Sequence, residues 1–256
     1  KSTKDSCDFL PCRAAKFLIY PAFSIMNTGS KLGGCAMLNQ PKEFWDMRAR
    51  DYDATSGSIY AKAYDLTVQR AADYLRPGDR LLDFACGTGL ATLRLAPYVS
   101  SVRGIDISPR MVEIARKKAA GLPNVEITNT GLFDPCLKAG SFDVAAAFNV
   151  LCYLPDLPGA LSRIHELLRP GGVFLSATDC LGGWPTKAGI KKFVKSHTGA
   201  MPYVAFFTQK SLARKIAQSG FHVLAQENLF PAPPNLFIAA RKAGPAEPSS
   251  VRPNFT

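Results

Sequence analysis

The stretch Arg80-Leu-Leu-Asp-Phe-Ala-Cys-Gly-Thr-Gly89 decides the fold of this chain. It is an apolar run that carries Asp83 near its end and is followed by a turn of small residues. A helical pattern comes next, and a second short strand over 101–105 ends in another acid, Asp106. The two glycines of the turn have no Cβ, so a ligand can approach the backbone closely. The stretch predicts a strand–helix–strand unit in which Asp106 lies where such units hydrogen-bond a ribose diol.

The spacing of the turn separates it from a dinucleotide-binding motif. That motif needs G-x-G-x-x-G, whereas this chain has Gly87-Thr-Gly89 with Ala85 at the earlier small position. Asp83, just before the turn, would repel the negative charges of a pyrophosphate. A cationic nucleotide that carries an amino acid suits this acid better. A nucleotide-dependent oxidoreductase therefore stays an alternative, which binding of a nicotinamide cofactor would support.

Two motifs, Leu82-Asp-Phe-Ala-Cys-Gly-Thr-Gly89 and Gly104-Ile-Asp-Ile-Ser-Pro-Arg-Met111, together resemble those of class I S-adenosylmethionine-dependent methyltransferases. The resemblance extends roughly from residue 44 to residue 242, and it is closest to the small-molecule, quinone-methyltransferase-like branch. It implies an α/β fold: a doubly wound, mostly parallel, seven-stranded Rossmann-like sheet with an antiparallel last strand and a small helical lid. It also implies S-adenosyl-L-methionine as the cofactor.

The chain divides into three parts by composition. We expect a poorly ordered extension over 1–40, a methyltransferase domain over 41–242, and a disordered tail rich in Pro and Ser over 243–256. The resemblance assigns lid elements to 41–60 and 180–207. The apolar run in the extension is far shorter than the ~20 residues that span a bilayer, so we predict no transmembrane segment.

Charge and cysteine usage bound the partners and the compartment. The formal net charge of +11 comes without a dense run of like charges, which favours a solvated basic surface over a nucleic-acid footprint. The cysteines are odd in number and form no C-x-x-C pair, so neither a metal site nor a disulfide framework is indicated. A thiol inside the ligand turn is typical of the reduced cytoplasm. The oligomeric state stays open.

The resemblance assigns cofactor contacts to the ends of successive strands. Asp83 and the glycines of the turn would hold the methionine portion, and Asp106 the ribose hydroxyls. Ile107 would pack on the adenine ring. Met111 could also reach this ring by family resemblance, and core packing is its competing role. The complete predicted set is Asp83, Ala85, Gly87, Gly89, Asp106, Ile107, Met111, Leu132, Phe148 and Asn149.

The sequence departs from the family pattern at Gly131. Relatives usually carry an Asp there, which accepts a hydrogen bond from the adenine amino group. Asn129, Asp134 or backbone groups would have to substitute, at a loss of about 0.5–1.5 kcal/mol for one such bond. The departure motivates a second alternative, a protein that binds S-adenosylmethionine without catalysis.

Lid and catalytic residues are less well determined. Trp45, Tyr52 and Trp184 are predicted to cover the substrate. A sulfonium methyl is already an activated electrophile, so transfer needs positioning first, and a general base only where the nucleophile carries a proton. The candidates for that base are Asp179, His197 and Tyr203.

These observations predict a methyltransferase that acts on a small molecule by in-line displacement. The Asn/Asp-Pro-Pro-Tyr/Phe motif of enzymes that methylate base amines is absent after the strand that ends at Asn149. An RNA or protein methyltransferase therefore stays an alternative that only the basic charge favours. The acceptor and the acceptor atom are not specified by the sequence.

Overall fold

The computed structural model describes residues 41–59, 61–183 and 187–243. All of them belong to one compact unit, Gly34–Thr256. The predicted extension over 1–40, the tail after Ala243 and the lid residue Trp184 lie outside the described residues.

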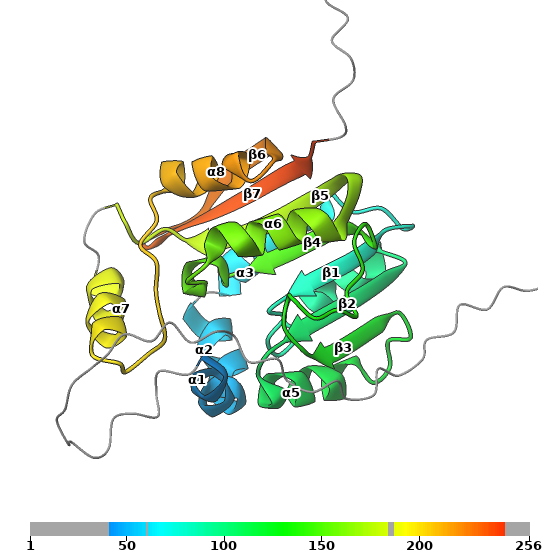
Figure 1. Cartoon of the computed structure of the whole chain (residues 1–256). Helices are drawn as coiled ribbons and strands as arrows, with labels where there is room; N and C mark the ends of the chain where they lie inside the picture. The colour runs from blue at the N-terminus through cyan, green and yellow to red at the C-terminus, as the bar shows by residue number, and fades with distance from the viewer. Residues whose placement is uncertain (1–40, 60, 184–186, 244–256) are drawn as a thin grey trace, which may run out of the picture. The chain divides into compact units, whose positions relative to one another are not determined.

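The described residues form one seven-stranded sheet of order β3-β2-β1-β4-β5-β7-β6 (Figure 1). Neighbouring strands pair in parallel, except that β7 is antiparallel to both β5 and β6. The strands are β1 (Arg80–Phe84), β2 (Ser101–Asp106), β3 (Val125–Asn129), β4 (Phe142–Phe148), β5 (Leu168–Asp179), β6 (Phe221–Pro231) and β7 (Pro234–Lys242). The predicted Rossmann-like sheet with an antiparallel last strand is thus confirmed.

Helices precede β1 and connect most of the parallel strands, whereas among the described residues β3 is followed by β4 with no helix between them. The helices are α1 (Pro41–Arg48), α2 (Tyr52–Ile59), α3 (Ala61–Ala72), α4 (Thr92–Leu95), α5 (Pro109–Ala119), α6 (Leu157–Leu167), α7 (Lys187–His197) and α8 (Gln209–Gln218). The start of α5 shows why the sequence sets these boundaries. Ser108 accepts a hydrogen bond from the backbone N–H of Met111, and Pro109 occupies the first turn, where its missing N–H costs nothing. Among the described helices, none has the length and apolar character that crossing a bilayer requires.

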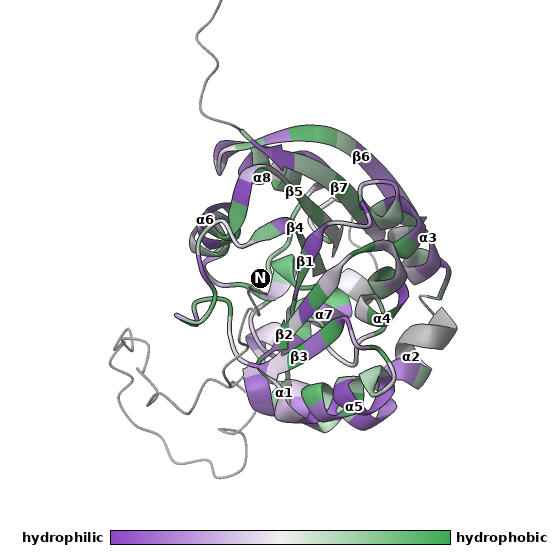
Figure 2. Ribbon diagram, turned by 90° about the vertical axis from the view of Figure 1, so that its right-hand side faces the viewer, coloured by the Kyte–Doolittle hydropathy of each residue, from purple (hydrophilic) through white to green (hydrophobic). Residues whose placement is uncertain are grey.

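Alternate residues of the strands build the two faces of the core, as the period of a strand requires. On one face Leu82, Ala145 and Phe174 pack with α6 and α8. On the other face Leu81 and Val144 pack with α3 and the region of α4. Figure 2 shows the hydrophobic residues concentrated on the central strands, whereas hydrophilic residues run along α1 and α5. The sheet is therefore a rigid platform whose strand ends carry the polar groups described below.

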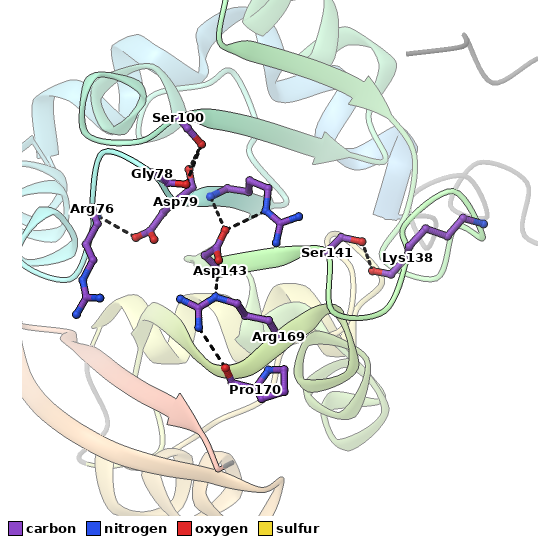
Figure 3. A network of polar contacts seen from close by, with 10 residues as sticks. Arg76, Gly78, Asp79, Ser100, Lys138, Ser141, Asp143, Arg169 and Pro170 are labelled. Carbon is purple, nitrogen blue, oxygen red and sulfur yellow. Dashed lines mark hydrogen bonds and ion pairs between the residues drawn. The ribbon is translucent and has the colours of Figure 1, made fainter. Parts of the chain in front are cut away.

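Asp143, near the amino end of β4, binds two arginines at the amino ends of the neighbouring strands β1 and β5 (Figure 3). It accepts hydrogen bonds from the backbone N–H of Arg80 at 2.9 Å, from the Arg80 guanidinium at 3.0 Å, and from the Arg169 guanidinium. Burial alone would raise the pKa of Asp143, but these bonds hold it below its ordinary value. Strand β5 accordingly begins at Leu168, with a register shift against β4 between Phe142 and Val144. The residues Arg169–Gly172 thus lie within β5.

Replacing Gly172 by alanine is expected to lower the free energy of unfolding by about 1–3 kcal/mol through overpacking. A Cβ there would lie 2.9 Å from the carbonyl oxygen of Arg169 and 3.0 Å from that of Asp143. Gly78→Ala is the matched control, because a Cβ at Gly78 meets nothing within 4 Å. Urea unfolding of both variants checks the prediction, and equal midpoints would contradict it.

Candidate functional site

The turn after β1 has an unusual backbone. Ala85, Gly87 and Gly89 have φ angles of 59°, 57° and 83°, in the left-handed region that favours glycine. A Cβ on Gly87 would meet nothing within 4 Å, so open space lies beside the backbone at this residue. A Cβ on Gly89 would lie 3.4 Å from the side chains of Ala115 and Leu93. Gly87 therefore leaves room for a ligand, whereas Gly89 lets the following helices pack closely.

Asp106 ends β2 and is only 8% exposed. One carboxylate oxygen accepts from the backbone N–H of Gly87 at 2.9 Å, and the other from the backbone N–H of Ser108 at 2.8 Å. Burial raises the pKa of Asp106, while these two bonds act in the opposite direction. Each oxygen has a second lone pair, so the carboxylate can hold the turn and accept from ligand hydroxyls at the same time.

Asp83 ends the neighbouring strand and is 2% exposed. It accepts a hydrogen bond from the Thr92 hydroxyl at 2.5 Å. Burial, opposed by this bond and reinforced by the charge of Asp106, raises the pKa of Asp83 to about 7. A cation placed beside these two acids would relieve the cost of holding them ionised.

A pocket opens between this turn and the second and third helices. Four predicted cofactor residues, Asp83, Ala85, Gly87 and Phe148, line it together with the predicted lid residue Tyr52. The Tyr52 hydroxyl lies 3.0 Å from that of Tyr64. The complete lining is Tyr52, Tyr64, Asp83, Ala85, Cys86, Gly87, Leu90, Ala91 and Phe148.

The three predicted adenine contacts differ in accessibility. Ile107 is 43% exposed, which leaves it available to a ring. Met111 and Leu132 are 2% and 3% exposed, and Leu132 belongs to the main core cluster. A Cβ on Gly131 would meet only Ile107, at 3.9 Å. The structure thus places Met111 and Leu132 in the core and leaves Ile107 beside the open surface at Gly131.

Neither predicted substitute for the missing acid is free of other bonds. Asn129 donates its amide to the carbonyl oxygen of Asp106 at 2.9 Å. Asp134 accepts from the Thr130 hydroxyl and, at 2.7 Å, from the backbone N–H of Cys136. Asn129 therefore ties the end of β3 to the end of β2, and Asp134 stabilises a local turn.

A line of polar side chains leads from the pocket to α7. Tyr64 hydrogen-bonds to Asn149, whose Oδ1 accepts from the Asn235 amide at 2.9 Å. The same amide donates to Asp179 at 2.9 Å, and Asp179 accepts from Lys192 at 2.9 Å. Asn149 and Asp179 were among the residues predicted from the sequence, whereas Tyr64, Asn235 and Lys192 were not. Only the position of Asn235 at the start of the last strand offered a signal.

The two predicted lid segments pack against each other. Phe44 of α1 forms an apolar cluster with Leu181, Met201 and Val204, which lie after β5. Trp45 joins this cluster and stands edge-on to the Tyr153 ring, with 5.3 Å between ring centroids.

Hydrogen bonds fasten the first lid segment to the ligand turns. Asp46 accepts from the Ser108 hydroxyl at 2.5 Å, and Asp53 accepts from the Thr88 hydroxyl at 2.5 Å and from Lys118. These contacts hold 41–59 over the turns that follow β1 and β2.

The three candidates for a general base are placed differently. His197 is exposed, and its ring lies 3.9 Å from that of Phe193 while Nδ1 contacts the Phe193 carbonyl oxygen. Tyr203 is 49% exposed. Neither residue lines the pocket. Asp179 alone of the three belongs to the polar line that reaches it.

Comparisons with known proteins agree with this geometry. A demethylmenaquinone methyltransferase of Symbiobacterium thermophilum is 32% identical over 142 residues, which make up 52% of this chain and 57% of that protein. An aklanonic acid methyltransferase of Streptomyces sp. (strain C5) is 39% identical over 111 residues, 41% of this chain and 50% of that protein. The chain spans about half the length of the curated relatives it matches.

A solved geranyl diphosphate methyltransferase in complex with SAM has a TM-score of 0.62 and 18% identity, with 75% of this chain and 91% of that chain covered. At this identity the likeness shows the fold alone. A family model described as a methyltransferase domain matches residues 57–226, well over half of the chain. The chain therefore belongs to this family of methyltransferase domains.

Proposed function

We propose that this protein uses S-adenosyl-L-methionine to methylate a small-molecule acceptor. The observation that carries the proposal is the juxtaposition of an open glycine turn with two buried acids at one pocket. Asp83 and Asp106 are 2% and 8% exposed, and Gly87 contacts Asp106 through its backbone N–H. Family membership supports the same reading.

The residues present fit this cofactor. When bound, S-adenosylmethionine supplies a methyl group activated by its sulfonium charge. Asp106 would accept hydrogen bonds from the ribose hydroxyls, and Asp83 would offset the positive charge of the methionine portion. The open side of Gly87 allows the ligand to approach the backbone, and Ile107 presents an apolar surface for the adenine ring. On the side of the lid, Tyr52 lines the pocket and Trp45 stands edge-on to Tyr52.

A small-molecule acceptor is supported by the names of several relatives. They include methyltransferases of demethylmenaquinone, of 2-phytyl-1,4-naphthoquinone and of aklanonic acid. The basic net charge of +11 is the only feature that favours RNA. The cytoplasm is the proposed compartment, supported by the free thiols of Cys86, Cys152 and Cys180 in the described residues.

The test is calorimetric titration with S-adenosylmethionine and with its demethylated product, followed by transfer of a labelled methyl group to a panel of phenols, quinols and carboxylic acids. We expect micromolar binding and turnover of one acceptor class. Failure to bind either nucleotide would overturn the proposal. Tight binding without turnover on any acceptor would favour the non-catalytic alternative, and salt-sensitive binding of RNA would favour an RNA methyltransferase.

A further inference from the structure

A compact cluster of titratable side chains lies at the carboxyl ends of β4 and β5, beside the pocket already described. Asp179 ends β5 and accepts a hydrogen bond from Lys192 of α7 at 2.9 Å. Lys192 also lies over the Tyr153 ring, with 5.7 Å between Nζ and the ring centroid. The thiol of Cys152 is the remaining titratable group that acts on Lys192. None of these contacts is needed to hold the cofactor.

The cluster is shielded from solvent but retains its charges. The side chains of Lys192 and Asp179 are 22% and 14% exposed. Burial works to lower the pKa of Lys192, but the Asp179 carboxylate raises it, so the ammonium persists at neutral pH. Burial raises the pKa of the Tyr153 phenol, which therefore stays a neutral hydrogen-bond donor. The three groups together carry one positive and one negative charge.

Asn235 fixes this cluster relative to the cofactor pocket. Its amide N–H groups are directed to Asn149 and Asp179, each at 2.9 Å. Its carbonyl oxygen is buried and has no hydrogen-bond partner among the described residues. Buried acceptors of this kind are rare and call for a donor. The opposite end of the line, Tyr64, lines the pocket itself.

An apolar groove adjoins the cluster. It is lined by residues of α7 and of the segment after β5, among them Leu181, Gly189, Phe193 and Phe206. Gly189 lies one helical turn before Lys192 and is buried. A flat or apolar body lying in this groove would contact α7, the helix that carries Lys192.

We propose that Lys192 and Asp179 form the acceptor subsite, and that the acceptor presents an acidic hydroxyl, a phenol or an enol. This inference rests on the proposed function and names its substrate class. A buried ammonium stabilises an oxyanion and disfavours a protonated amine, so it selects acceptors that ionise to anions. Asn235 is a positioning residue, because it acts by orienting Asp179.

The acceptor hydroxyl gives its proton to the Asp179 carboxylate, and its oxygen is held by Lys192. The new O–CH₃ bond forms as the C–S bond breaks, and the electron pair of that bond remains on sulfur. The proton leaves Asp179 for solvent after the product departs. The role of Lys192 is to lower the pKa of the bound hydroxyl so that a carboxylate suffices as the base.

The test uses 4-nitrophenol, whose anion is coloured, added to the full chain saturated with S-adenosylhomocysteine. In the wild type we expect the acid dissociation constant of bound 4-nitrophenol to be about 10- to 100-fold larger than in water, as an adjacent cation produces. Lys192→Met should abolish this increase and Lys192→Arg should retain most of it. Asp179→Asn should increase the constant further, because it removes the negative charge. Lys191→Met, on the exposed side of the same helix, should behave as wild type.

Two measurements keep the outcomes separate. Calorimetry with S-adenosylhomocysteine should give the same affinity within about twofold for wild type and Lys192→Met. In both proteins 4-nitroanisole should compete equally well with 4-nitrophenol for binding, because 4-nitroanisole has no proton to lose. If the wild type binds no nucleotide, the proposed function fails, while the phenol titration without nucleotide still reports on Lys192. Absence of 4-nitrophenol binding, an unchanged dissociation constant, or no effect of Lys192→Met and Asp179→Asn would overturn the subsite.

Discussion

Replacing Asp106 by alanine is expected to weaken binding of S-adenosylmethionine by about 1–3 kcal/mol, a loss of roughly 5- to 150-fold in affinity. The carboxylate is the only predicted acceptor for the ribose hydroxyls, and charge-assisted hydrogen bonds are the strong ones. The variant should also be less stable without ligand. The backbone N–H groups of Gly87 and Ser108 both donate to Asp106, and each unsatisfied buried donor costs about 1–3 kcal/mol.

The matched control is Asp79→Ala. Asp79 is also buried, at 7% exposure, and accepts from the backbone N–H of Arg76 at 2.9 Å, but it precedes β1 at the opposite edge of the sheet. Its replacement should lower the free energy of unfolding and leave the nucleotide affinity of the folded protein unchanged. Calorimetry below the unfolding temperature of each variant makes the comparison. Equal losses of affinity in the two variants would mean that Asp106 acts only through stability.

The fold was predictable because its signals are local. Each parallel strand is a short apolar run with its own turn or cap, such as Ser108 before α5. The start of β5 also involves a contact between residues distant in sequence. Gly171, within this strand, has a φ angle of 73°. Arg169 of the same strand donates a hydrogen bond to Asp143 of β4.

The candidate site was predictable where it coincides with a motif, and not elsewhere. Asp83, Gly87 and Asp106 follow from one continuous stretch. Met111 and Leu132 could not be separated from core residues, because an apolar side chain suits an adenine ring and a core equally well. The partners of Asp179 come from β7 and α7, and only tertiary packing brings Asn235 and Lys192 to it. Helix phase likewise turned His197 toward Phe193.

Asp83 is expected to make both stability and cofactor binding depend on pH near neutrality. Its pKa is raised to about 7 by burial, so the folded protein binds a proton that the unfolded chain, with a pKa near 3.8, has released. The contribution of Asp83 to the free energy of unfolding is therefore greatest at low pH, and it is lost as the pH rises to about 7. Between about pH 5 and about pH 8 the loss amounts to about 2.5 kcal/mol.

Cofactor binding has the opposite dependence, because a cation favours the ionised carboxylate, and affinity should rise about tenfold from pH 6 to pH 8.

Comparison with Asp83→Asn isolates the contribution of Asp83 to the pH dependence. The variant keeps every other titrating group of the protein, and the ligand titrates in the same way in both experiments. The difference in unfolding free energy between wild type and Asp83→Asn, measured in urea across this pH range, should fall by the stated amount and level off above about pH 7. Thr92→Val should move the pH at which the curve levels off upward, because the Thr92 hydroxyl donates to Asp83 at 2.5 Å and lowers its pKa. A difference that stays flat above about pH 5 would show that Asp83 ionises as an ordinary carboxyl. The buried acid would then need no cation, and the electrostatic argument for a sulfonium ligand would lose its basis.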